Sequence, residues 1–252
     1  MKNKIIVITG GATGIGLAII KKLINDNTVI SIDRNPAKIA ALKAALPKVE
    51  SLKADVTSNE ELSNVIASIE KSHGKIDMLI NNAGKGEVFD FVKTPEKELM
   101  KRIETEMSIN YFAPILLTKK ALPLLQKSTE PIVVIVSSGL AYMPSNTGAT
   151  YSATKSAIHF VTMCLRHQLA PLKIRVVEVL PPVVETDMSK DITGLKKMPV
   201  DKFAQLFLDK LSKGENIMNI GQTAALEKFS RFFPKAAFKM LNPRRKKSIA
   251  QN

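Results

Sequence analysis

Residues 5–16 read Ile-Ile-Val-Ile-Thr9-Gly10-Gly-Ala-Thr-Gly14-Ile-Gly16, an apolar run that enters a glycine-rich turn, and a helical pattern of apolar residues begins at Gly14. Glycine permits a tight turn at Gly10, a close backbone approach to a phosphate at Gly14 and close helix–strand packing at Gly16. The first turn of such a helix presents unpaired N–H groups and a positive dipole to an anion. An ordinary strand-to-helix loop is the alternative, but the strand before and the helix after favour a nucleotide site.

Short apolar runs alternate with longer segments of helical periodicity along the chain. The predicted strands cover 4–9, 28–33, 49–54, 76–81, 131–138 and 173–180, and the predicted helices cover 14–26, 36–46, 59–72, about 95–127 and 150–170. Nearly continuous Ile, Val and Leu is typical of strands in a sheet that is covered on both faces. The alternation predicts an α/β fold, a doubly wound Rossmann-type parallel sheet of about seven strands with helices on both faces. We expect one domain over residues 1–252, because no linker or composition break precedes about residue 222.

The composition is that of a globular protein, with 252 residues of which 45% are hydrophobic and 24% charged. The single cysteine, Cys164, excludes an internal disulfide and fits a reducing compartment, so we expect a cytoplasmic protein. The apolar helix around it predicts a packed thiol. The three histidines lack the spacing of metal ligands, and we expect no metal site. No apolar stretch approaches the length that spans a bilayer.

The net charge of +14 is concentrated near the C-terminus, where residues 222–252 form an unusual basic extension. Its phenylalanines alternate with Lys and Arg and predict a basic amphipathic helix interrupted at Pro234; they are Phe229, Phe232, Phe233 and Phe238. We expect these rings to pack on their own domain or on a second subunit. Weak contact with an anionic membrane is the second interpretation. Specific nucleic-acid binding ranks third, because no recognised module accompanies the charge.

Polar residues follow several of the predicted strands, at the edge where open α/β sheets bind ligands. Asp33 closes the second strand, where an acid accepts hydrogen bonds from ribose hydroxyls and repels a 2′-phosphate, which favours NAD. Arg34 follows it and can pair with a 2′-phosphate, so NADP remains the alternative. Asp55 follows the third strand and Asn82-Ala-Gly84 the fourth. Capping or turn formation is the alternative role for these last residues, but their repeated position favours a ligand role.

Tyr151 and Lys155 lie four residues apart in a predicted helix, which places a phenol and an ammonium on one face. A neighbouring cation stabilises the phenolate and lowers the phenol's pKa from about 10 toward the range that suits an acid/base catalyst. Ser138 ends the preceding strand, and its hydroxyl can donate to a substrate oxygen with developing charge. Asn110 lies inside a long helical pattern although asparagine is a poor helix former. It predicts either an exposed polar residue or a local kink whose freed carbonyl holds a water.

These residues together resemble the short, single-domain branch of the short-chain dehydrogenase/reductases. The resemblance is strong over about residues 1–190 and rests on Thr9-Gly-(x)3-Gly14-x-Gly16, Asp55, Asn82-Ala-Gly84, Asn110, Ser138, Tyr151 and Lys155. It implies a NAD(P)-dependent oxidoreductase that interconverts an alcohol and a carbonyl by hydride transfer and that assembles as a homodimer or homotetramer. A cofactor-binding regulatory or scaffolding protein with little turnover is the alternative function.

The resemblance also implies a role for each matching residue. Tyr151 is the expected general acid/base, while Lys155 lowers its pKa and binds the nicotinamide ribose. Ser138 positions the substrate oxygen, and Asn110 supports a water through which protons pass to Lys155. Contacts with the cofactor are expected from Thr9, Gly10, Thr13, Gly14, Ile15, Gly16, Asp33, Arg34, Asp55, Val56, Asn82, Ala83, Gly84, Tyr151, Lys155, Val184 and Thr186.

Two stretches depart from the family pattern. Where the family has a Pro-Gly pair before a threonine, this chain has Pro181-Pro182-Val-Val-Glu-Thr186, and residues 215–221 replace the usual glycine-rich final strand. Together with Leu165-Arg-His-Gln-Leu169, they resemble a bacterial DltE-like subgroup of these oxidoreductases. We expect residues 187–200 to form the substrate loop, and no residue pattern there indicates which alcohol or carbonyl binds.

Overall fold

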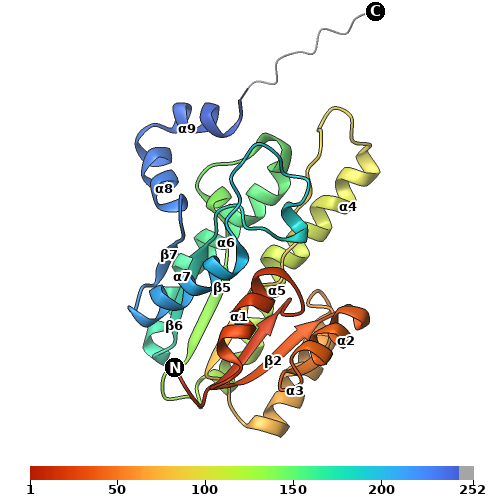
Figure 1. Ribbon diagram of the computed structural model, residues 1–252, viewed down its shortest axis with the longest axis vertical. Coiled ribbons are helices and arrows are strands. Elements are labelled where there is room, and N and C mark those ends of the chain that lie inside the picture. Colours follow the sequence, from red (N-terminus) through yellow and green to blue (C-terminus); the bar gives the residue numbers. More distant parts are fainter. Residues whose placement is uncertain (244–252) are drawn as a thin grey trace, which may run out of the picture.

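A parallel sheet with the strand order β3-β2-β1-β4-β5-β6-β7 forms the centre of the molecule (Figure 1). The computed structural model describes residues 1–243. The strands are β1 (Ile5–Thr9), β2 (Thr28–Asp33), β3 (Glu50–Lys53), β4 (Met78–Asn81), β5 (Ile132–Val136), β6 (Arg175–Leu180) and β7 (Ile217–Asn219). The prediction of a doubly wound α/β fold with about seven parallel strands is therefore confirmed.

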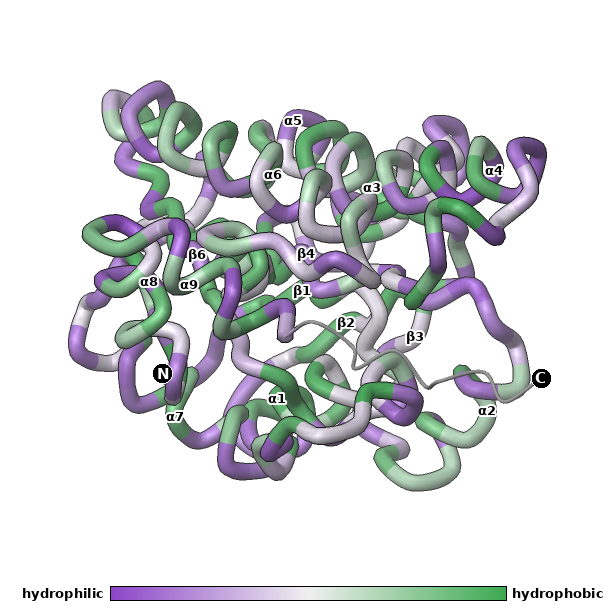
Figure 2. The backbone as a smooth tube through the Cα atoms, turned by 90° about the horizontal axis from the view of Figure 1, so that it is seen from above, coloured by the Kyte–Doolittle hydropathy of each residue, from purple (hydrophilic) through white to green (hydrophobic). Residues whose placement is uncertain are grey.

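Helices cover both faces of this sheet. They are α1 (Gly14–Leu23), α2 (Pro36–Ala45), α3 (Asn59–His73), α4 (Glu96–Met107), α5 (Ala113–Leu125), α6 (Ala149–Gln168), α7 (Val200–Ser212), α8 (Thr223–Phe232) and α9 (Pro234–Leu241). Figure 2 shows α3, α4, α5 and α6 along one side of the strands, with α1, α2 and α7 along the other. The strand order reverses between β1 and β4, which is where folds of this kind bind their ligands.

Alternation of side chains along each strand builds two hydrophobic cores. In β1, Ile6 and Ile8 enter the core beneath α1 and α7, while Val7 enters the core beneath α3, α5 and α6. Phe203 and Phe207, one helical turn apart in α7, are fully buried in the first core. Each such side chain stabilises the fold by roughly 1.5–3 kcal/mol relative to exposure. The sheet is thus a rigid base for the loops that leave its carboxyl edge.

The long helix predicted over about 95–127 is divided by a π-helical turn, Ser108–Phe112, between α4 and α5. Pro114 lies four residues after Asn110, so it provides no N–H for the carbonyl of Asn110, and its ring crowds that carbonyl. The local widening resolves this conflict. The kink interpretation of Asn110 is confirmed, and the exposed-residue interpretation is wrong because Asn110 is buried.

The last two helices, α8 and α9, pack against each other and project beyond the sheet, at the upper left of Figure 1. The helix is interrupted between them at Phe233 and Pro234, as predicted. Packing of Phe232, Phe233 and Phe238 on their own domain is not observed, since they are 70%, 61% and 40% exposed, and packing on a second subunit stays a prediction. Contacts of these helices with the body include Thr223 and Leu226 beside Gly139 and the hydrogen bond from Asn242 to the Pro144 carbonyl. Residues 244–252 of the predicted basic extension lie outside the described residues.

Cys164 also differs from its prediction. The thiol is exposed, on the outer face of α6 near the exposed Phe160 and Met163, and is not packed. The inner face of the same helix is formed by Ile158 and Thr162. Both faces of α6 carry apolar residues, so periodicity alone did not show which one faces the sheet. Within residues 1–243 no helix is long and apolar enough to cross a bilayer, and no group of three metal-ligating side chains is present.

Candidate active site

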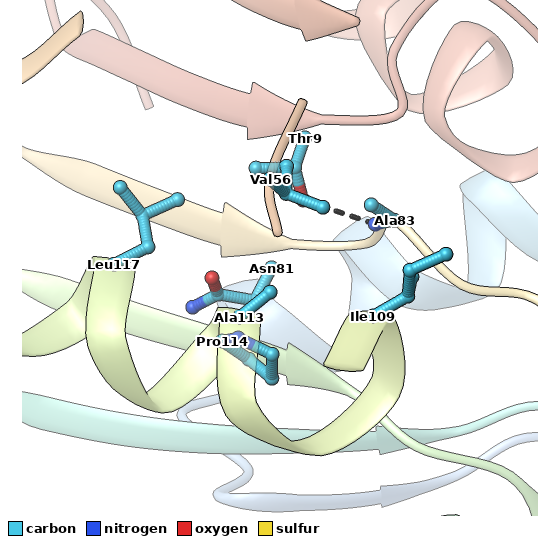
Figure 3. Close-up of a pocket in the computed structure, with 8 residues that line it drawn as sticks. All are labelled: Thr9, Val56, Asn81, Ala83, Ile109, Ala113, Pro114 and Leu117. Carbon is cyan, nitrogen blue, oxygen red and sulfur yellow. Dashed lines mark hydrogen bonds between the residues drawn. The ribbon is translucent and has the colours of Figure 1, made fainter. Parts of the chain in front are cut away.

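The glycine turn after β1 is held in place by the loop after β4. The Oγ1 of Thr9 accepts hydrogen bonds from the backbone N–H groups of Asn82 and Ala83, both at 3.0 Å. In return, the Asn82 side chain donates to the carbonyls of Thr9 at 2.9 Å and Gly10 at 3.1 Å. Figure 3 shows the Thr9–Ala83 contact above a small pocket that Val56 and Asn81 also line. Four of the predicted cofactor residues thus form one hydrogen-bonded unit.

Three positions of this turn require glycine, two because of their backbone conformation and one because a side chain has no room. Gly10 and Gly14 have φ values of 66° and 56°, a region that favours glycine. A Cβ at Gly16 would overlap the carbonyl oxygen of Gly10 and lie 2.7 Å from the Asn82 amide nitrogen. The predicted tight packing at Gly16 is therefore confirmed, and it lets α1 begin directly behind the turn.

The N-terminus of α1 is open to an anion. The Thr13 side chain makes no capping hydrogen bond, and the first turn has no acidic residue. Its N–H groups and the helix dipole can therefore serve a phosphate. Thr186 comes within van der Waals distance of this turn, since a Cβ at Gly14 would lie 3.2 Å from the Thr186 methyl. Ile15, by contrast, packs against the first core.

The acids after β2 and β3 lie side by side. Asp33 accepts a hydrogen bond from the Asn35 N–H at 3.2 Å, and the Arg34 guanidinium pairs with Asp55 at 3.2 Å. Burial raises the pKa of the Asp55 carboxyl, but hydrogen bonds from Thr57 and the Arg34 pair hold that pKa below its usual value overall. Arg34 is therefore engaged by a protein carboxylate, while Asp33 retains acceptor capacity at the strand end.

Tyr151 and Lys155 share one face of α6, and the Lys155 ammonium lies 5.5 Å from the Tyr151 ring centre. Lys155 is buried and donates to the Val136 carbonyl at 2.9 Å. Burial lowers the pKa of Lys155 to about 8, against an opposing effect of Glu178. Ser138, two residues after β5, accepts the Leu140 N–H at 3.1 Å, and its own O–H lies within hydrogen-bonding reach of Tyr151.

The pKa of Tyr151 is a correction to the sequence-based expectation. Burial raises it to about 12, a hydrogen bond with Ser138 lowers it, and the negative charge of Glu106 raises it further. The expected lowering by Lys155 is absent, because the ammonium is directed at the Val136 carbonyl. In this structure the phenol therefore holds its proton at neutral pH.

Asn110 joins the loop after β4 to α6. Its amide accepts the Lys85 N–H at 2.9 Å, and it donates to the Lys85 carbonyl at 2.7 Å and to the Thr154 hydroxyl at 3.0 Å. A Cβ at Gly84 would lie 3.5 Å from the Asn110 side-chain oxygen and 3.9 Å from the Lys155 nitrogen. Gly84, Asn110 and Lys155 are thus brought together as predicted. The water expected at the Asn110 carbonyl stays a prediction.

The double-proline stretch closes back on the predicted substrate loop. Val184 is buried and forms an isolated bridge with Met198, supported by hydrogen bonds from Glu185 N–H to Met198 and from Met198 N–H to Val183, at 2.9 and 2.8 Å. The Ser189 hydroxyl donates to the Val184 carbonyl at 2.7 Å. These contacts fix both ends of residues 187–198, while Met188 and Leu195 stay about half exposed.

The C-terminal helices border the segment that links Ser138 to Tyr151. A Cβ at Gly139 would lie 3.3 Å from Thr223 of α8. At the end of α9, Asn242 accepts the Asn146 N–H at 2.6 Å and donates to the Pro144 carbonyl at 2.9 Å. No sequence motif indicated these contacts, because they join residues about a hundred positions apart.

Glu106 was also missed by the sequence analysis. It is fully buried, one helical turn before Asn110, and accepts the Glu87 N–H at 3.1 Å. Its only signal in the sequence is its position four residues before Asn110, which places the two side chains on the same side of the helix.

Comparison with known proteins gives a consistent result. Residues 4–196 match the model of the short chain dehydrogenase family. The uncharacterized oxidoreductase DltE of Bacillus subtilis is 35% identical over 221 residues, which cover 85% of this chain and 87% of DltE. Benzil reductase ((S)-benzoin forming) IRC24 of Saccharomyces cerevisiae is 30% identical, with 81% of this chain and 83% of that protein covered. A short chain dehydrogenase from Burkholderia cenocepacia, solved with NADP, superimposes with a TM-score of 0.83 at 24% identity, covering 95% of this chain and 98% of that one.

Proposed function

The chain belongs to the short chain dehydrogenase family of oxidoreductases, and from this we propose that it interconverts an alcohol and a carbonyl by hydride transfer, with Tyr151 as the general acid/base. The observation that carries the proposal is the convergence of Tyr151, the buried Lys155 and the Ser138 hydroxyl, with the Lys155 ammonium 5.5 Å from the Tyr151 ring centre. A nicotinamide cofactor bound at the glycine turn supplies the hydride. The alternative, a regulatory cofactor-binding protein, does not require this convergence.

The two hydroxyl groups have complementary tasks. Ser138 is placed to donate to the substrate oxygen, because the hydrogen bond that it accepts from the Leu140 N–H does not use its own O–H. Tyr151 gives its proton to the same oxygen as negative charge develops there. With a pKa of about 12 the phenol is almost fully protonated near neutral pH, which is the form that donates a proton when a carbonyl is reduced. The pKa of Lys155 is about 8, close to neutral pH, so Lys155 can return a proton to Tyr151 after the reaction.

Replacement of Tyr151 tests the proposal. We expect Tyr151→Phe to lower the rate of carbonyl reduction by about 10²–10⁴-fold while cofactor affinity is retained, because only the acid/base group is removed. The assay follows the absorbance of NADH or NADPH over a panel of aldehydes, ketones and alcohols. Tyr111→Phe is the matched control, since Tyr111 lies outside the site in the π-helical turn. Equal activity of wild type and Tyr151→Phe would contradict the catalytic role, and cofactor binding without turnover would favour the regulatory alternative.

We propose NAD as the preferred cofactor and NADP as the alternative. Asp33 stands at the ribose position, and the Arg34–Asp55 pair at 3.2 Å withdraws the nearest cation from a 2′-phosphate. The Burkholderia relative, solved with NADP, keeps the alternative open. Asp33→Ala should shift the ratio of kcat/KM for NADH and NADPH toward NADPH by about tenfold. The variant loses both an acceptor for the ribose hydroxyls and a charge that repels the 2′-phosphate. An unchanged ratio would indicate that Arg34, rather than Asp33, sets the choice between NADH and NADPH, and Arg34→Ala would test this.

The helical face opposite the sheet supports a homo-oligomer. Four large apolar side chains are 43–65% exposed on α5, α6 and the π-helical turn before α5: Phe112, Leu116, Phe160 and Met163. Contiguous patches of this kind mark interaction surfaces. Sedimentation equilibrium should give the mass of a dimer or tetramer, and the mass of one chain at micromolar concentration would contradict the proposal. The cytoplasmic location stays a prediction.

A further inference from the structure

The buried residue of α4 is a glutamate. Glu106 is fully buried, and within residues 1–243 it forms no ion pair. Burying a carboxylate without a cation is costly, and burial raises the pKa of Glu106 although Thr150, the Glu87 N–H and Arg102 oppose this. An apolar residue would fill the position at lower cost. The hydrogen-bonding capacity of the carboxyl is therefore the feature to explain.

Glu106 and Asn110 hold two residues of one loop. Glu106 accepts the Glu87 N–H at 3.1 Å, and Asn110 makes two hydrogen bonds with the Lys85 backbone at 2.9 and 2.7 Å. Both side chains come from the same stretch, at the junction of α4 and the π-helical turn. Gly86 lies between the two anchored residues.

Gly86 lies directly on the ring of Tyr151. A Cβ there would lie 2.6 Å from the Tyr151 Cδ2 and 2.9 Å from its Cγ, closer than any side chain tolerates. The backbone at Gly86 therefore packs directly against the Tyr151 ring. The two anchors hold the Gly86 backbone against the ring, together with the ion pair of the Glu87 side chain with Arg102 at 2.8 Å.

A second contact links Glu106 to the residue before this tyrosine. Its other carboxyl oxygen is buried without a geometric hydrogen bond, and so is the hydroxyl of Thr150, the residue before Tyr151. The Thr150 hydroxyl is nevertheless close enough to stabilise the carboxylate. One carboxyl group thus lies between the loop that covers the ring and the backbone that carries it.

We infer that Glu106 is a positioning residue of the proton-donor site, whose carboxyl, with the Asn110 amide, holds residues 85–87 against the ring of Tyr151 and so fixes the direction of the phenol. The inference rests on the proposed function, in which Tyr151 gives the proton. A proton donor must lie within hydrogen-bonding distance of its acceptor. Greater mobility of residues 85–87 therefore lowers the rate of the chemical step and leaves cofactor binding intact.

Three variants test this role by activity. Glu106→Leu removes the acceptor at similar volume and should lower kcat about tenfold with little change in KM or cofactor affinity, the effect of one lost hydrogen bond. Glu106→Gln keeps an acceptor for the Glu87 N–H and should restore most of kcat. Glu104→Ala, at an exposed position of α4, is the control. The inference is overturned if Glu106→Leu keeps the wild-type kcat, or if Glu106→Gln loses as much as Glu106→Leu.

Hydrogen–deuterium exchange gives a readout that needs no turnover. The Glu87 amide should exchange faster in Glu106→Leu than in wild type and remain protected in Glu106→Gln, because only the latter provides an acceptor. If wild type reduces no carbonyl, the proposed function fails while the exchange rates still decide the anchoring. Equal Glu87 exchange in wild type and Glu106→Leu overturns the inference whatever the activity. Glu106→Met repeats both measurements if the Leu variant does not fold.

Discussion

The proposed cofactor side of the site and its proposed substrate side are built in different ways. On the cofactor side, backbone groups and short side chains lock the turn after β1 to the loop after β4, and a Cβ at Gly16 would overlap its neighbours. On the substrate side, the fixed ends of residues 187–198 hold the half-exposed Met188 and Leu195, and α8 carries the exposed Phe232. The first side is defined by backbone geometry and the second by side chains that face outward.

This difference follows from what each side has to recognise. A dinucleotide has the same phosphates and riboses in every enzyme that binds it, so a short local pattern of glycines and strand-end acids is sufficient. A substrate differs from one enzyme to the next, and loops with exposed side chains tolerate that variation. The two sides should therefore respond differently to substitution.

The largest effect is expected on the cofactor side. Gly16→Ala places a methyl group against the Gly10 carbonyl and 2.9 Å from the Gly11 Cα, so we expect cofactor affinity to fall about tenfold to a hundredfold through displaced backbone. Fluorescence titration with NADH measures the Kd. Gly148→Ala is the matched control, because its Cβ has 3.9 Å to its nearest neighbour and a φ of −122°. Equal Kd values for the two variants would mean that close packing at Gly16 is not required.

An intermediate effect is expected at the partly buried pair His159–Glu178, which joins α6 to β6 at 2.9 Å. The hydrogen bond that His159 donates to the Glu178 carboxylate raises the pKa of His159, although burial opposes this. Such a group stabilises the fold fully below its unfolded value of about 6.5, and the contribution is lost as pH rises through the raised folded pKa. Glu178→Gln should therefore cost about 1.5–3 kcal/mol near pH 6 and less near pH 9.

Urea unfolding at both pH values measures this difference. Charges that face the pair come from several elements, namely Lys155 and Arg166 of α6, Tyr142 before it and Glu227 of α8. Glu70→Gln is the control, since its pair with Lys127 is a surface contact with both side chains about half exposed. A destabilisation of Glu178→Gln that is the same at pH 6 and pH 9 would show that His159 is not charged in the folded state.

The sequence was sufficient to predict the sheet, the glycine turn and the Tyr151–Lys155 pair, because each depends on spacing within a few residues. Apolar runs specify strands, and four residues place two side chains on one helix face. The division of the long helix at Asn110 was visible in part, since Pro114 follows four residues later. These features are local, so no knowledge of distant packing was needed.

Features that depend on distant packing were not predictable. Glu106 reads as a surface charge until the loop at Glu87 covers it. The pKa of Tyr151 rises rather than falls because burial outweighs a cation that is directed elsewhere. Cys164 lies outward because α6 has apolar residues on two faces, and only the sheet decides between them. In each case the deciding neighbour is far away in the sequence.

The smallest effect on stability is expected at the tips of α8 and α9. Phe232→Ser combined with Phe233→Ser should change the free energy of unfolding by less than about 0.5 kcal/mol, because both rings are mostly exposed. Phe207→Ala, at a fully buried position of α7, should cost about 3–5 kcal/mol in the same urea experiment.

A loss of stability above about 1 kcal/mol in the double variant that grows on dilution would place a second copy of the chain over these rings. Unchanged stability together with weaker binding to phosphatidylserine vesicles would instead support the membrane interpretation, since Arg231, Lys235 and Lys239 flank the same surface. Either result would show that the exposed phenylalanines of α8 and α9 serve a contact with another molecule rather than the packing of their own core.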